Sequence, residues 1–168
     1  MMRAFANKGF LTVVAVACTM WCGQTAMAQG NSLTGLLDEA GFDYIERDGI
    51  YKVILEGDER TVTVVCGEET MWEDDNGNPV KVVWLWTTIL AVQEGFRHPP
   101  ALLRRVANIN DTMKPGNLSV NENNGNVYYN SAFWLDSATP QIMVDELLLA
   151  YFRQPELRKE LAPYAEEE

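Results

Sequence analysis

The most continuous apolar stretch of the chain is residues 80–92, VKVVWLWTTILAV, which is apolar at both odd and even positions. In an extended chain Trp84 and Trp86 point to one side, and Val83 and Leu85 point to the other. A strand at a wetted surface alternates apolar and polar side chains, so this strand needs cover on both sides. Its β-branched and aromatic residues favour a strand over a helix. We expect the rest of the fold to be organised around it.

One short helix is predicted at the start of the first half. Its apolar positions have the spacing of a single helix face: Leu33, Leu36, Leu37 and Ala40. Asn31 or Ser32 can serve as N-cap, Gly41 ends the helix, and Phe42 stands where a side chain folds back on the last turn. The pattern predicts an amphipathic helix from about Leu33 to Ala40.

Three strand-like runs follow the helix, at residues 43–47, 50–56 and 60–67. Turn signals separate them, the first being Asp48-Gly49. The next segment, residues 68–79, is acidic and rich in turn residues, which predicts a loop before the strand at 80–92. The first half therefore reads as a helix followed by an antiparallel meander.

The second half predicts a helix, a hairpin and a final helix. Pro99-Pro100 begins the first of these helices, whose buried side would comprise Leu102, Leu103, Val106, Ala107 and Ile109. A short strand at Leu118 and Val120 and a longer strand at 126–135 flank a turn at 122–125. Thr139 and Pro140 are an N-cap and N1 pair for the last helix, and Pro155 is expected to break it.

These elements predict one α+β domain: an antiparallel sheet of about five strands with the helices packed on it, in the order α-βββ-α-ββ-α. The domain would span residues 29–164, with an acidic tail at 165–168. Three amphipathic helices cover one face of such a sheet well and leave the other face open.

The N-terminus has the pattern of a secretory signal peptide. Arg3 and Lys8 are basic, residues 10–18 are apolar, and residues 26–28 (Ala-Met-Ala) form a small-x-small site, so we expect cleavage after Ala28 and a periplasmic or secreted protein. The apolar run is shorter than the roughly 20 residues of a membrane span. Lipidation at Cys18 is an alternative that fits less well, because Ala15 stands where lipoprotein signals usually carry leucine.

Removal of residues 1–28 takes away two cations and changes the formal net charge from −11 to −13. This charge argues against nucleic acid and anionic membranes as partners, and it favours basic ones. Only Cys66 then remains, so no internal disulfide supports the fold, and Cys66 itself reads as a small buried hydrophobe.

Residues 102–135, LLRRVANINDTMKPGNLSVNENNGNVYYNSAFWL, resemble the YbjN-like family, described as putative bacterial sensory transduction regulators. The likeness consists of a helix with Asn108 and Asn110 near its end, then Gly116, a short strand, an Asn124-Gly125 hairpin and a long apolar strand. The order of elements is also similar to that of type III secretion chaperones, small acidic dimers that hold an extended client segment. This resemblance implies a chaperone-like fold and a protein partner, although those chaperones act in the cytoplasm.

The sequence contains no convincing catalytic or metal-binding constellation. A thiol hydrolase would need Cys66 beside His98, the only histidine, and no motif brings them together. The run from Asp74 copies the first positions of a calcium loop, but Pro79 and Leu85 replace its glycine and its final glutamate. A solvated charge run explains this segment better than a cation site. We expect a non-enzymatic protein with no cofactor.

Four aromatic residues are the candidate binding residues: Trp84, Trp86, Phe133 and Trp134. Core packing explains them in part, whereas an open sheet face would offer them to a second copy of the protein or to a client. We therefore expect a chaperone-like protein-binding module with an unidentified partner, or a homodimer. The alternative is a sensory domain that binds a small ligand in a pocket lined by the tryptophans.

Overall fold

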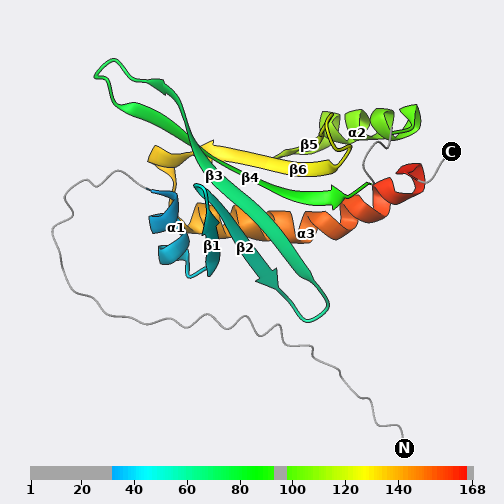
Figure 1. Ribbon diagram of the computed structural model, residues 1–168, viewed down its shortest axis with the longest axis horizontal. Coiled ribbons are helices and arrows are strands. Elements are labelled where there is room, and N and C mark those ends of the chain that lie inside the picture. The colour runs from blue at the N-terminus through cyan, green and yellow to red at the C-terminus, as the bar shows by residue number, and fades with distance from the viewer. Residues whose placement is uncertain (1–31, 93–97, 166–168) are drawn as a thin grey trace, which may run out of the picture.

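The computed structural model describes residues 32–92 and 98–165. They form an α+β fold with a six-stranded antiparallel sheet in the order β1-β2-β3-β4-β6-β5 (Figure 1). The elements are α1 (Leu33–Ala40), β1 (Tyr44–Arg47), β2 (Ile50–Glu56), β3 (Thr61–Glu73), β4 (Pro79–Leu90), α2 (Pro100–Thr112), β5 (Asn117–Val120), β6 (Val127–Trp134), a 3-10 turn (Leu135–Ser137) and α3 (Pro140–Ala165). The predicted signal peptide lies outside the described residues.

The sheet has six strands, where the sequence predicted about five, because the short run before Asp48-Gly49 is a strand of its own. Both turn residues have positive φ, 55° for Asp48 and 75° for Gly49, which suits a two-residue turn between antiparallel strands. Arg47 accordingly pairs with Ile50 across the turn. The predicted first helix is confirmed, with Ser32 as N-cap and Gly41 in the left-handed conformation at its end.

The predicted loop at residues 68–79 is mostly strand, because β3 continues to Glu73 and β4 already begins at Pro79. Only a tight turn remains between them. Asp74 holds this turn, since its carboxylate accepts hydrogen bonds from the backbone N–H groups of Asn76 and Asn78, both at 2.8 Å. The result is a long hairpin whose tip extends past the other strands (Figure 1).

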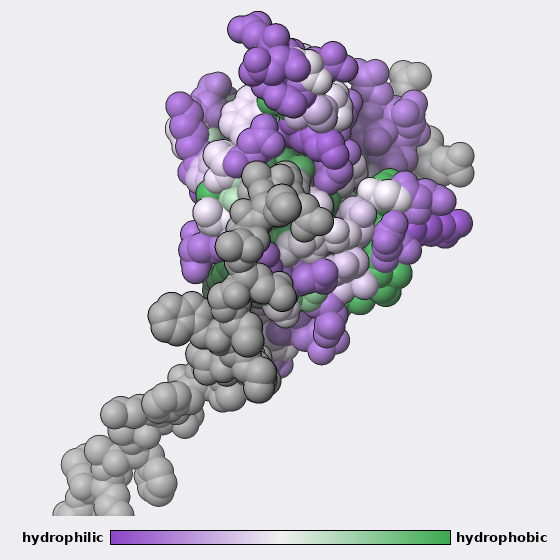
Figure 2. Space-filling view, turned by 90° about the vertical axis from the view of Figure 1, so that its left-hand side faces the viewer, coloured by the Kyte–Doolittle hydropathy of each residue, from purple (hydrophilic) through white to green (hydrophobic). Residues whose placement is uncertain are grey.

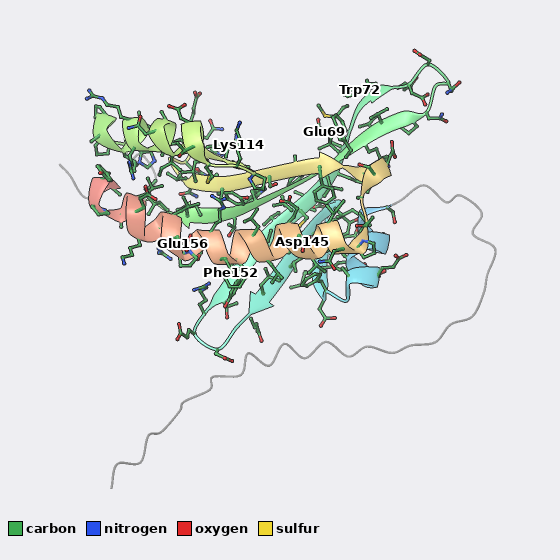
Figure 3. The ribbon with its side chains drawn as sticks, turned by 180° about the vertical axis from the view of Figure 1, so that it is seen from behind. Glu69, Trp72, Lys114, Asp145, Phe152 and Glu156 are labelled. Atoms are coloured by element: carbon green, nitrogen blue, oxygen red, sulfur yellow. The ribbon has the colours of Figure 1, made fainter. Side chains whose placement is uncertain are left out.

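β4 lies in the interior of the sheet, paired with β3 on one side and β6 on the other, as its apolar sequence predicts. Val83, Leu85, Thr87 and Ile89 are buried on the face that the helices cover. α1 and α3 lie behind the sheet in Figure 1 and in front of it in Figure 3, and α2 packs against α3 and β5. We call this the covered face; its other side is the open face.

α3 is a single helix of 26 residues and continues through Pro155, which corrects the predicted break. A proline inside a helix leaves the carbonyl four residues earlier without its usual donor, which here is the carbonyl of Tyr151. The guanidinium of Arg60 donates to that oxygen at 3.4 Å and lies 4.4 Å from the Tyr151 ring centroid. Arg60 thus replaces the missing hydrogen bond and supports the continuous helix. Among the described helices, none is long and apolar enough to cross a membrane.

Candidate functional site

The open face carries apolar side chains on its first four strands and on β6. Strand pairing places Ile45, Ile50, Ile54, Val65, Val82, Trp84, Trp86 and Trp134 on this side. Several are well exposed, including Ile45 at 59% and Trp134 at 46%. Polar residues usually occupy the solvent side of an antiparallel sheet, so this composition marks the face as a candidate interaction surface.

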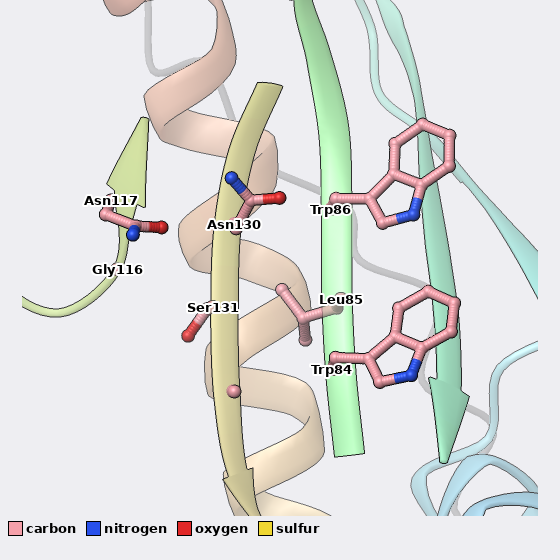
Figure 4. A pocket seen from close by; sticks show the side chains of 8 residues that line it. Trp84, Leu85, Trp86, Gly116, Asn117, Asn130 and Ser131 are labelled. Carbon is pink, nitrogen blue, oxygen red and sulfur yellow. The ribbon is translucent and has the colours of Figure 1, made fainter. Parts of the chain in front are cut away.

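Trp84 and Trp86 lie side by side on β4, and in Figure 4 both indole rings extend over β3. The partner of Trp84 on β3 is Gly67, which has no side chain to obstruct the ring. Trp86 makes an edge-to-face contact with Tyr128, with 4.8 Å between ring centroids. The two tryptophans are thus held against the sheet, and both are partly exposed.

Trp72 adds a fourth tryptophan that the sequence did not single out. It lies on the long hairpin of β3 and β4 (Figure 3), pairs with Val80, and is 52% exposed. Its ring contacts that of Trp134 edge-to-face, with centroids 5.2 Å apart. Trp72 was missed because residues 68–79 read as a loop; the Asn76-Gly77 turn signal between two runs was the available indication of a hairpin.

Phe133 does not belong with the three tryptophans with which the sequence grouped it. It pairs with Val83, which is buried, and packs against the core under the helices. Phe133 and Trp134 are adjacent in one strand, so their side chains point to opposite faces. The structure therefore brings Trp84, Trp86 and Trp134 to the open face and assigns Phe133 to the core.

A shallow hollow of about 520 Å³ borders the two central tryptophans on the β6 side. Its lining includes Trp84, Trp86, Asn117, Asn130 and Ala132. The Asn130 amide donates a 2.8 Å hydrogen bond to the hydroxyl of Ser119 on the neighbouring strand. The hollow thus combines aromatic rings with uncharged amide groups.

Charged side chains also lie on the open face, where strand pairing places Arg47, Lys52 and Glu69. Figure 2 views the molecule from the left-hand side of Figure 1. The hydrophilic tip of the β3–β4 hairpin lies at the top of this view, and hydrophobic patches lie below it. Hydrogen bonds from Asn78 and from the turn N–H groups hold the pKa of Asp74 below its usual value. Because its carboxylate already serves the turn, Asp74 has a structural role. Within the described residues, no group of three or more His, Cys, Asp or Glu side chains could hold a metal ion.

Cys66 and His98 lie on different parts of the fold. Cys66 is fully buried on the covered face of β3, and burial raises the pKa of its thiol to about 12. The His98 imidazole contacts the Gly125 carbonyl at the β5–β6 turn. At neutral pH the Cys66 thiol is therefore protonated and shielded from solvent, unlike a reactive cysteine.

Comparison with known proteins gives no relative for this chain: no family model matches it, and neither does a curated protein or a solved structure.

Proposed function

We propose that this chain is an exported, non-enzymatic protein-binding module of chaperone-like character, which binds its partner on the open face of the sheet. The observation that carries the proposal is the uncovered apolar face, with Trp72, Trp84, Trp86 and Trp134 on one continuous surface. Tryptophan side chains bury large areas and dominate the energetics of protein interfaces. The net charge, −11 for the full sequence and −13 without residues 1–28, favours basic partners over acidic ones.

The sequence resemblance supports a further part of the proposal, a distant relationship to YbjN-like proteins with the arrangement of type III secretion chaperones. The observed order of helix, strands, helix, hairpin and helix is compatible with it. The export signal would then place the chaperone-like activity in the periplasm or outside the cell. A basic, partly unfolded client is the partner that best fits this combination.

Capture experiments with periplasmic extract would test the proposal. Trp134→Ala and Trp86→Ala should each lose captured proteins or self-association while keeping the native thermal unfolding midpoint. Phe152→Ala is the matched control, since Phe152 is also an exposed aromatic, at 52%, but lies on α3 away from the open face. A native protein that stays monomeric and captures nothing, or a loss as large in Phe152→Ala as in the tryptophan variants, would overturn the proposal.

The hollow beside Trp84 and Trp86 favours one second candidate, a domain that senses a small uncharged ligand. Trp84 and Trp86 would supply apolar contacts to the ligand, and Asn117 and Asn130 would bind its polar groups. Thermal stabilisation and a change in tryptophan fluorescence with a metabolite panel would support this function.

A further inference from the structure

The two edges of the sheet differ in how their backbone groups are satisfied. At the β5 edge, the Asn110 side chain of α2 lies against Leu118: its amide nitrogen donates to the Leu118 carbonyl at 2.9 Å, and its oxygen accepts from the Leu118 N–H at 2.7 Å. One amide thus bonds both outward groups of this residue, as a neighbouring strand would. Proteins cover edge strands in this way to prevent pairing with other chains.

The β1 edge has no such cover in the part of the chain that the structure describes. β1 is the last strand on its side of the sheet, and three of its four residues are exposed. Residues that flank a two-residue turn form a hydrogen-bonded pair, and such pairs alternate along an antiparallel ladder. Because Arg47 pairs with Ile50 across the turn, Ile45 also bonds toward β2, whereas Tyr44 and Glu46 direct their N–H and C=O groups outward.

The side chains around this edge define what would fit there. On the covered side, strand alternation places the side chains of Tyr44 and Glu46 next to each other along this edge. Burial and the nearby carboxylate of Asp38 raise the pKa of the Tyr44 hydroxyl, in keeping with acidic surroundings. On the open side, Ile45 is exposed; its direct neighbour on β2 is Lys52, and Ile50 and Ile54 lie diagonally across from it. The nearby cations are Arg47, which pairs with Asp48 at 3.6 Å, and Lys52, which points to the open side.

We propose that the β1 edge binds an extended peptide segment as a seventh strand, with basic side chains at the alternate positions that face Asp38 and Glu46. The other positions would be apolar and would extend the open face beyond Ile45. Backbone hydrogen bonds supply affinity in such strand addition, and alternate side chains supply specificity. This inference rests on the proposed function, since it specifies the chemistry and conformation of the partner that the open face receives.

A fluorescently labelled acetyl-(Val-Lys)4-amide peptide is the probe, with binding followed by fluorescence anisotropy. The native chain should bind it, and the acidic counterpart acetyl-(Val-Glu)4-amide should not bind. Glu46→Pro removes the outward N–H without touching the ladder to β2 and should weaken binding at least about tenfold. Glu46→Gln keeps this N–H and should weaken binding only a few-fold, with a smaller dependence on salt.

Two further probes keep the test independent of how the protein variants fold. One probe carries N-methyl groups on the backbone nitrogens of its lysines, and the other carries them on the backbone nitrogens of its valines. Each probe therefore keeps backbone N–H donors along only one of its two edges. Exactly one of them should lose binding: the lysine-methylated probe if the added strand is antiparallel to β1, or the valine-methylated probe if it is parallel. Equal binding of all three probes, no binding of the parent probe, or unchanged binding by Glu46→Pro would overturn the proposal.

The capture experiment distinguishes a failure of strand addition at the β1 edge from a failure of the proposed function. If Glu46→Pro still captures periplasmic proteins and Trp134→Ala does not, the open face binds its partner without strand addition. If neither variant alters capture, the proposed function fails as well.

Discussion

Gly67 on β3 and Trp84 on β4 are cross-strand partners, and the indole of Trp84 lies across the glycine. A Cβ atom at residue 67 would stand only 2.1 Å from Cζ2 of Trp84, so the ring occupies the space that any other residue would fill. An aromatic ring that covers a glycine in a neighbouring strand is a known device for stabilising sheets. Here it also turns Trp84 toward β3 and leaves the hollow beside Asn130 uncovered (Figure 4).

Gly67→Ala should therefore displace the Trp84 ring and lower the free energy of unfolding by about 1–3 kcal/mol, the usual cost of overpacking. Urea denaturation measures this cost, and tryptophan fluorescence reports the change around the ring. In the Trp84→Ala background the added methyl group has no ring to displace, so the same substitution should cost less than about 0.5 kcal/mol. Equal costs in both backgrounds would show that Trp84 does not require a glycine there.

Asn110→Ala should remove both hydrogen bonds to Leu118 and open the β5 edge. The expected loss is about 1–3 kcal/mol of unfolding free energy, because a donor and an acceptor lose their partners together. The freed edge should also promote association at high concentration, which analytical ultracentrifugation would detect. Asn108→Ala is the control, since Asn108 is an exposed residue on the same helix. Identical behaviour of the two variants would contradict the capping role of Asn110.

The central strand shows what the sequence could predict. The parity of residues 80–92 placed Trp84 and Trp86 on one side and Val83 and Leu85 on the other, and the structure confirms both the strand and this division. The same rule of alternation separates Phe133 from Trp134, and the error was to group them by type. Parity alone did not tell which side the helices cover, since that depends on contacts between distant elements.

The errors in element boundaries have local physical causes. Residues 68–79 are acidic and rich in turn residues and read as a loop. Residues 68–73 nevertheless form strand, because the other arm of the hairpin satisfies their backbone groups and Asp74 fixes the turn. Pro155 reads as a helix end, yet Arg60, 95 residues earlier in the chain, donates to the carbonyl that the proline leaves free. Leu103 reads as buried, but α2 covers too little of the core and leaves it 46% exposed. Each outcome depends on a partner that local sequence does not reveal.

Glu68 links the hairpin to the first helix, and its effect on stability should depend on pH. Partial burial opposes ionisation of its carboxyl group, but hydrogen bonds from Lys81, at 2.7 Å, and from the Leu33 N–H outweigh this and lower the pKa. A lowered pKa in the folded state means that the stabilisation is present at neutral pH and is lost as pH falls through that pKa.

Glu68→Gln should consequently lower the free energy of unfolding by about 0.5–1 kcal/mol at pH 7. The difference from the native chain should narrow as the pH falls below the ordinary carboxyl value of 4.5. Chemical denaturation at a series of pH values measures it. Glu69→Gln is the control, since Glu69 is an exposed neighbour that points to the open face, and it should leave the free energy of unfolding at pH 7 nearly unchanged. If the difference in free energy of unfolding stays constant across this pH range, the ionised Glu68 carboxylate does not stabilise the fold as inferred.

Cys66 should be inert to thiol reagents while the chain is folded. Its side chain is fully buried, and with a pKa of about 12 only a very small fraction is thiolate at pH 8. Iodoacetamide should therefore modify Cys66 at least roughly a thousand times more slowly than an ordinary thiol, whose pKa is about 8.5. Peptide mass spectrometry would follow the label at this residue. Thr63→Cys provides the control, because residue 63 is exposed on the other face of β3 and should react at once. Fast labelling of Cys66 without denaturant would mean that the helices often separate from the covered face of the sheet. The labelling rate then measures the free energy of this local opening.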